Sequence, residues 1–186
     1  MFDGSDTVVL YNELAYEEVR PVKWVPLSGS VDTVLAASFS ERNVRLLQAL
    51  AAIEDHGVSD KPDEATPDLM RLDFKINLLL DLVGQLLVAN RPQPAAVAIR
   101  FNAHGAVWHC TAPLPPAGSH GIVEIHLRDF LAEPLRLPGT LAEVTAAAEA
   151  TVRFAPVGEP VADLLERLIF RHHRRHVAGI RQPRND

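Results

Sequence analysis

Two histidines near the C-terminus are spaced as in a helical zinc site. His172 and His176 are four residues apart, so a helix would place both on one face. A catalytic zinc also needs a third ligand and a base, and neither stands near this pair in the sequence. The other histidines and the single cysteine fall in expected strands and turns without a ligand-like spacing. We therefore expect no metal and no other cofactor.

Nucleophilic catalysis has no sequence support either. Cys110 lies in an apolar strand-like run, where a free cysteine is most often a small buried hydrophobe. The sequence lacks a G-x-S-x-G motif, a P-loop and a G-x-G-x-x-G motif. We expect no catalytic residues and predict that the protein is not an enzyme.

Three arginines, Arg167, Arg171 and Arg175, are spaced four residues apart and would line one helix face. They indicate either a surface for an acidic partner or anionic ligand, or a solvated helix end whose cations favour the helix dipole. The net charge is -6, yet residues 167–184 carry six arginines and no acid. This asymmetry favours a local contact surface over nucleic-acid binding, because the aromatic residues are too dispersed for a base-stacking platform.

Short β-rich runs separated by Pro and Gly begin at residue 95 and predict a small antiparallel barrel or sandwich. They read AAVAIRF, AVWHC, GIVEIHL, PLRLPGTLAEV and EATVRFAPV. A helical pattern follows in EPVADLLERLIFRHHRRHVAGI. At the other end, residues 7–27 predict a strand and a lead-in that becomes irregular around Pro21 and Pro26.

Two long helices are expected between this N-terminal strand and the other strands. The first begins near SFSERNV, where Ser38 and Glu41 form a potential capping box, and Gly57 is suited to its end. The second starts at Pro67 and follows a heptad alternation over three heptads. Its a and d positions are Leu69, Leu72, Ile76, Leu79, Val83 and Leu86. The first helix has a similar stripe, which includes Leu46, Leu50 and Ile53.

Such a pattern is typical either of a core helix packed on its own domain or of a coiled coil. Further leucines, among them Leu78 and Leu82, widen the apolar surface of the second helix beyond a two-stranded seam. We therefore expect the two helices to form a hairpin that assembles with copies from other chains. A homotetramer is favoured and a dimer is the alternative.

The composition fits one folded domain of 186 residues, with 47% hydrophobic and 23% charged residues. Asp81 and Gln85 interrupt the longest apolar run, so no membrane span is expected. The N-terminus has no signal-peptide pattern, and a single cysteine cannot form an internal disulfide. These features favour a cytoplasmic location.

The order of elements resembles the PilZ domain family of small six-stranded barrels, which are receptors for the bacterial second messenger cyclic di-GMP. RFNAHGAVWHC stands where the Asp/Asn-x-Ser-x-x-Gly motif of the family lies, VEIHL is similar to its central strand, and ATVRFAPVGEPVADLLERLIFRHHRRH is similar to its closing strand and helix. With two long inserted helices, the chain resembles the atypical, tetramer-type subgroup. The resemblance implies an α+β fold with three parts: an N-terminal strand and lead-in over 1–30, an inserted helical hairpin over 31–91, and most of the barrel with its C-terminal helix over 92–186.

The ligand motifs of the family are degenerate in this chain. Asn102 matches the first position, but His104 replaces the serine and Val107 the glycine, while Gly105 fits only another register. The upstream Arg-x-x-x-Arg is absent, because Arg20 is followed at position 24 by a tryptophan. Each charge-assisted hydrogen bond lost to a phosphate costs about 1.5 to 3 kcal/mol.

The resemblance therefore implies a non-enzymatic PilZ-type protein that works through protein partners in signalling or motility, without tight cyclic di-GMP binding. The alternative is a receptor for cyclic di-GMP or another nucleotide that uses noncanonical residues, with Asn102, His104 and Arg100 as candidates.

Overall fold

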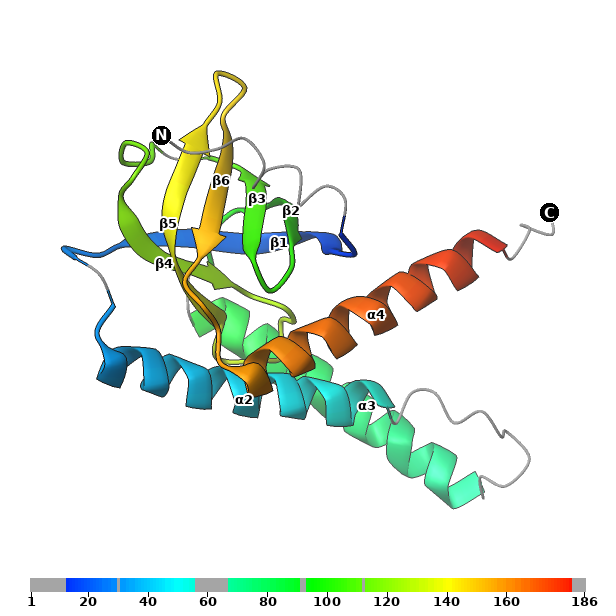
Figure 1. Ribbon diagram of the computed structural model, residues 1–186. Coiled ribbons are helices and arrows are strands. Elements are labelled where there is room, and N and C mark those ends of the chain that lie inside the picture. The colour runs from blue at the N-terminus through cyan, green and yellow to red at the C-terminus, as the bar shows by residue number, and fades with distance from the viewer. Residues whose placement is uncertain (1–12, 30, 56–66, 91–92, 112, 182–186) are drawn as a thin grey trace.

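The computed structural model describes residues 13–29, 31–55, 67–90, 93–111 and 113–181. These residues form an α+β fold in which three helices lie below and to one side of a six-stranded barrel (Figure 1). The elements in chain order are β1 (Tyr16–Pro26), α2 (Thr33–Asp55), α3 (Pro67–Asn90), β2 (Ala96–Phe101), β3 (Gly105–His109), β4 (His120–Ile125), β5 (Leu135–Val144), β6 (Glu149–Phe154) and α4 (Glu159–Arg181). The predicted runs from residue 95 onward all form strands, which confirms the expected fold class.

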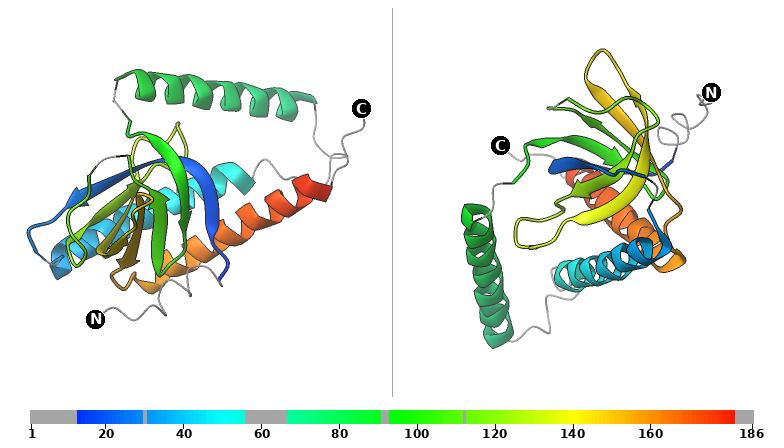
Figure 2. Two further views of the ribbon diagram at one scale, coloured as in Figure 1. Left: turned by 90° about the horizontal axis from the view of Figure 1, so that it is seen from above. Right: turned by 90° about the vertical axis from the view of Figure 1, so that its left-hand side faces the viewer.

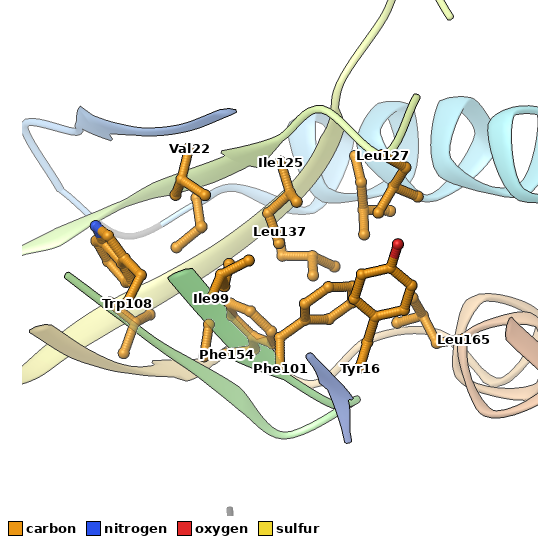
Figure 3. Close-up of a cluster of buried hydrophobic side chains, with 14 of the residues drawn as sticks. Tyr16, Val22, Ile99, Phe101, Trp108, Ile125, Leu127, Leu137, Phe154 and Leu165 are labelled. Atoms are coloured by element: carbon orange, nitrogen blue, oxygen red, sulfur yellow. The ribbon is translucent and has the colours of Figure 1, made fainter. Parts of the chain in front are cut away.

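The strands close into an antiparallel barrel in the order β1-β2-β3-β6-β5-β4. One face of the strands points into the barrel, most clearly in β5, where every second residue from Leu135 to Leu141 is buried. These inward side chains meet aromatic residues from β1, β2 and β6 in one core (Figure 3). The largest members of that core include Tyr16, Phe101, Ile125, Leu137 and Leu165.

The expectation that the chain becomes irregular at Pro21 is wrong. β1 continues through this proline, pairing with β2 from Tyr16 to Pro21 and with β4 from Val22 to Pro26. Pro21 thus lies where β1 passes from one neighbour to the other. A strand can tolerate the missing N–H at this point, and the Pro21 carbonyl still accepts a hydrogen bond from His126 N at 3.0 Å. The apolar run at residues 7–11 lies outside the described residues.

Helix α2 begins earlier than the potential capping box suggested. Asp32 is its N-cap, because the Asp32 Oδ1 atom accepts a hydrogen bond from Leu35 N at 2.7 Å. Ser38 and Glu41 therefore lie within the helix. An aspartate is as good an N-cap as serine, and the intervening Thr33–Ala37 segment contains no residue that would stop a helix from extending to it.

Within the described residues, helix α2 packs against its own chain and has no extensive contact with α3. Its main neighbours are α4 and β5, whereas α3 stands apart from it (Figure 2). Leu46 and Leu50 are buried in the core of the chain, and Ile53 is half-buried. The side chains of Leu46 and Leu50 are therefore already covered within the single chain. A heptad-like pattern predicts only that one face of a helix is buried. The barrel and α4 bury that face of α2.

Helix α3 makes little contact with the rest of the chain. Among the described elements it has no extensive contact with another helix or strand, and Figure 2 shows it lying beside the barrel. It comes close to the barrel side at Gly84, where a Cβ atom would lie 3.3 Å from the backbone nitrogen of Phe130 in the loop after β4. Within the described residues, no helix is long and apolar enough to cross a membrane.

Candidate functional site

The degenerate motif forms the turn between β2 and β3, and Asn102 is the residue that holds this turn together. Its side chain is buried, with 3% exposure. The Asn102 Oδ1 atom accepts hydrogen bonds from His104 N at 2.8 Å and from Gly105 N at 3.1 Å. The backbone nitrogen of Asn102 also donates to Gly105 O at 3.0 Å. Asn102 is therefore committed to the turn as an Asx-type residue.

His104 and Gly105 contribute differently to this turn. Gly105 is buried at the start of β3, whereas the His104 side chain is exposed. The His104 Nε2 atom lies 3.7 Å from the Glu13 carboxylate, which also accepts a hydrogen bond from Asn102 Nδ2 at 3.3 Å. Of the three predicted ligand-binding residues, the structure thus leaves only the His104 ring facing outward, and it faces a carboxylate.

A groove of about 620 Å³ runs beside this turn. We call it the hairpin groove, and its walls come from the segment before β1, from the β2–β3 turn and from α4. It is lined by Glu13, Leu14, Asn102, Ala103, His104, Glu166, Arg167, Ile169 and Phe170. The sequence identified Asn102, His104 and Arg167 as candidates but missed the others. The one available signal was Phe170, a large aromatic residue on the polar side of an amphipathic helix.

The charges of the hairpin groove do not suit a phosphate diester. Two carboxylates, from Glu13 and Glu166, face one arginine, Arg167. Glu13, which precedes β1, therefore places a negative charge beside the degenerate ligand motif. Carboxylates close to a phosphate repel it, and the single guanidinium cannot form the paired bidentate contacts that two phosphates favour.

The three arginines of the expected partner surface have separate environments. Arg167 is exposed at the hairpin groove, and Arg171 is half-buried. Arg175 instead reaches α2, where its Nη1 atom lies 3.2 Å from Glu54 Oε2. Arg175 therefore links α4 to α2 through an ion pair. Of the three arginines, Arg167 is the one that lines the hairpin groove.

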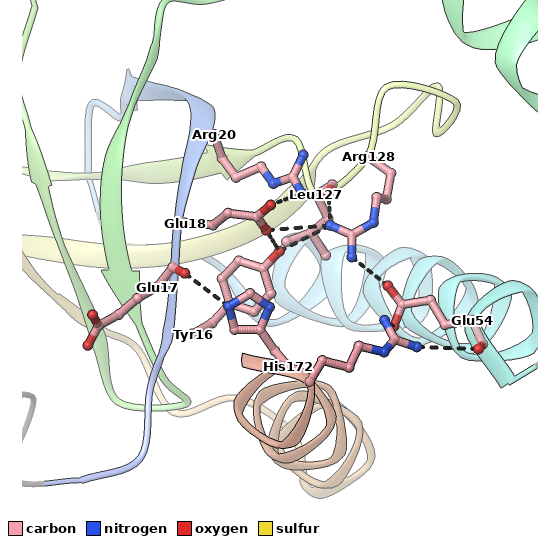
Figure 4. Close-up of polar contacts among 9 residues, drawn as sticks. Tyr16, Glu17, Glu18, Arg20, Glu54, Leu127, Arg128 and His172 are labelled. Atoms are coloured by element: carbon pink, nitrogen blue, oxygen red, sulfur yellow. Dashed lines mark hydrogen bonds and ion pairs between the residues drawn. The ribbon is translucent and has the colours of Figure 1, made fainter. Parts of the chain in front are cut away.

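A cluster of polar side chains joins β1, α2 and α4 (Figure 4). Arg128, in the loop after β4, donates from Nη2 to Glu54 Oε1 at 2.6 Å and from Nη1 to the Tyr16 hydroxyl at 3.1 Å. The Tyr16 hydroxyl in turn donates to Glu18. Arg20 donates to the other oxygen of Glu18 at 2.6 Å. We call these residues, together with Arg175, the arginine clasp.

His172 completes the contact between α4 and β1. Its ring lies on Tyr16 with centroids 4.1 Å apart, and its Nε2 atom is 2.9 Å from the Glu17 carbonyl oxygen, to which it donates. This placement accounts for His172 without a metal. Across the described residues, no group of three or more His, Cys, Asp or Glu side chains is arranged to hold a metal ion.

The pKa shifts in the clasp keep its charges fixed. Burial raises the pKa of Tyr16, and its hydrogen bond to Glu18 adds to this effect. Burial also opposes ionisation of Glu18, but the hydrogen bonds from Tyr16 and Arg20 outweigh burial and lower the pKa of that carboxyl. Burial raises the pKa of the Cys110 thiol, which makes it a poor nucleophile at neutral pH. Tyr16 therefore stays protonated and Glu18 stays ionised at neutral pH, which preserves the hydrogen bonds of the clasp.

The predicted seam of α3 is exposed in the single chain. Its a and d residues, Leu69, Leu72, Ile76, Leu79, Val83 and Leu86, are between 44% and 63% exposed. Phe74, Leu78 and Leu82 add exposed apolar surface beside the seam. The opposite side of α3 faces the body, where Gly84 and Asp81 share a second groove with Arg20 and Arg128.

Comparisons with known proteins identify what this arrangement is similar to. Residues 47–182, well over half of the chain, match the family model described as an atypical PilZ domain and cyclic di-GMP receptor. A solved structure from Xanthomonas campestris is 26% identical, with a TM-score of 0.71, and the match covers 94% of this chain and 96% of that one. That protein is described as pathogenic and as a new tetrameric PilZ domain self-assembled via an unusual helical bundle. No protein with a curated description matches the chain.

Proposed function

The chain belongs to the atypical PilZ domain family, and from this premise we propose that it is a non-enzymatic signalling protein that self-assembles through α3. Its role is to present the barrel and α4 to protein partners in the cytoplasm. The observation that carries the proposal is the exposed apolar surface of α3, which the other described residues leave uncovered.

Self-assembly is the arrangement that removes this surface from water. Full burial of one Leu, Val, Ile or Phe side chain is worth about 1.5 to 3 kcal/mol, and six such residues line the seam alone. Isolated helices gain little stability in water without a packed apolar face. The Xanthomonas relative assembles as a tetramer, which supports the same number of chains here, and the wide apolar surface of α3 agrees with more than one neighbouring helix.

The proposed function does not include tight binding of cyclic di-GMP, although the family is described as a receptor for this nucleotide. Asn102 is engaged in its own turn, and Glu13 and Glu166 bring negative charge to the groove where the degenerate motif lies. The alternative is a receptor that uses noncanonical residues. It is favoured by the exposed His104 and Arg167 at the same groove. Arg100 does not support it, because its guanidinium forms an ion pair with Glu17.

Light scattering coupled to size exclusion, followed by calorimetric titration of the same sample with cyclic di-GMP, tests both parts of the proposal. We expect a stable assembly of four chains and no saturable heat at micromolar nucleotide. Low-micromolar binding at physiological salt would contradict the proposal and favour the alternative. Charge removal by Glu13→Gln with Glu166→Gln should then strengthen that binding.

A further inference from the structure

The hairpin groove is suited to a partner of a particular chemistry. We propose that it binds a segment of a protein partner in which an apolar side chain stands next to lysine or arginine. This inference rests on the proposed function as an interaction protein and names the chemistry of the partner. It also gives a role to a groove that is unsuited to the nucleotide.

An apolar floor provides the first argument. Phe170 is 54% exposed and Leu14 is 45% exposed, and they lie at the groove beside Ile169, which is buried. Single exposed apolar residues are common, but here two large ones line one concave surface. A volume of about 620 Å³ is in the range that holds a few side chains. An apolar or aromatic anchor of a partner would therefore be removed from water here.

The acidic rim provides the second argument. Glu13 and Glu166 stand at the groove. Glu13 already lies 3.7 Å from the His104 ring and accepts a hydrogen bond from Asn102, whereas Glu166 has no ion pair among the described residues. A lysine or arginine beside the apolar anchor would meet these carboxylates, whereas an acidic segment would be repelled. Arg167 is the opposing charge, and a flexible exposed guanidinium can turn away from a cationic partner.

The wall of the groove is held in place by contacts within the chain itself. Asn102 holds the β2–β3 turn through two hydrogen bonds to backbone N–H groups, and Ile169 anchors α4 in the core. Binding to such a surface costs less conformational entropy than binding to a mobile loop. The retained asparagine thus shapes a docking site for a peptide instead of contacting a nucleotide.

Two peptides that share an apolar centre and differ in the sign of their charge provide the test. Fluorescein-labelled Lys-Leu-Phe-Arg-Lys and its reversed counterpart Glu-Leu-Phe-Glu-Glu are titrated against the full-length assembled protein, with fluorescence anisotropy as the readout. We expect saturable binding of the basic peptide alone. Glu166→Lys and Phe170→Ala should each weaken it on the order of tenfold. Asp163→Lys, on the exposed side of α4 outside the groove, is the matched control and should leave the affinity within about twofold.

Several outcomes overturn the inference. These are no binding of the basic peptide, equal loss in the Asp163→Lys control, or full affinity in the Phe170→Ala protein. Unlabelled cyclic di-GMP is added as a competitor. If it displaces the peptide, and if it binds more tightly to the Glu166→Lys variant, the groove is a nucleotide site, and both this inference and the proposed function fail. If the basic peptide does not bind and cyclic di-GMP does not bind either, only this inference is overturned and the proposed function stands. Circular dichroism of each variant verifies that it is folded.

Discussion

Two buried asparagines, Asn43 and Asn102, use their side chains to complete the hydrogen bonding of the backbone. Asn102 does so in the β2–β3 turn. Asn43 lies on α2 and pairs with the edge of β5, donating to Arg136 O at 2.7 Å and accepting from Arg136 N at 3.0 Å. At this point β5 has not yet paired with β6, whose register begins at Gly139. Both residues therefore satisfy peptide groups that would otherwise be buried without partners.

Replacing Asn43 should destabilise the fold. Asn43→Ala leaves the partly buried N–H and C=O groups of Arg136 without these partners, at a cost of about 1 kcal/mol or more for each group. We expect a lower free energy of unfolding, measured by urea denaturation at a fixed protein concentration. Gln48→Ala, an exposed position on the same helix, is the control and should change stability little. Equal stability of the two variants would contradict the role of Asn43.

His172 should make the contact between α4 and β1 sensitive to acid. Burial lowers its pKa from the ordinary value of 6.5. The folded state therefore favours the neutral ring, and the contribution of His172 is present above pH 6.5 and is lost as the pH falls through the lowered pKa. In His172→Phe the aromatic contact with Tyr16 remains without this titration. We expect its melting temperature to decline less than that of the wild type between pH 7.5 and 5.5.

The matched control for this measurement is His173→Phe, since His173 is the adjacent exposed residue. It should keep the pH dependence of the wild type. Burial also lowers the pKa of His126, so part of the acid sensitivity should remain in the His172→Phe protein. The same slope in all three proteins would show that His172 does not contribute.

At the scale of elements, the five strands after residue 95 could be predicted because turn residues bound each alternating run. β1 could be predicted only in part, since nothing in the sequence shows that Pro21 lies where the strand changes partner. The two long helices have similar heptad patterns and opposite roles. α2 is covered by its own chain, while α3 is exposed. The wider apolar surface of α3, which includes Leu78 and Leu82, is the sequence feature that distinguishes the two helices.

Gly84 should determine how closely α3 approaches the barrel. A larger side chain would meet the backbone of Asp129 and Phe130 at about van der Waals distance or less. Gly84→Leu should therefore push α3 away from the loop, at a cost of about 1 to 3 kcal/mol that exceeds the gain in helix propensity. We expect faster amide exchange at residues 128–131, detected by hydrogen-exchange mass spectrometry, with assembly retained.

Asn77→Leu is the control for this substitution. It places the same side chain on α3, two turns earlier, at an exposed position. Its exchange pattern in the loop should match the wild type. If Gly84→Leu also leaves the loop unchanged, the close approach does not hold α3 in place.

For the whole molecule, the closed order of the barrel and the charge of the hairpin groove are the features that the sequence could not provide. Glu13 and Glu166 are 153 residues apart in the chain, and only the fold places them on one groove beside Asn102. The molecule therefore has two surfaces of different character. One is the exposed apolar face of α3, which we propose contacts other copies of the chain, and the other is the hairpin groove, which we propose binds a basic partner.

The mass of the assembly in solution tests the central proposal most directly. Light scattering coupled to size exclusion should be performed on the wild type, on Leu79→Lys at a d position, and on Asn77→Lys, which adds the same charge on α3 outside the seam. We predict a mass of four chains for the wild type and for Asn77→Lys, and a smaller species for Leu79→Lys, because a buried lysine in an apolar seam opposes association. A monomeric wild type, or an unchanged mass in Leu79→Lys, would contradict assembly through α3.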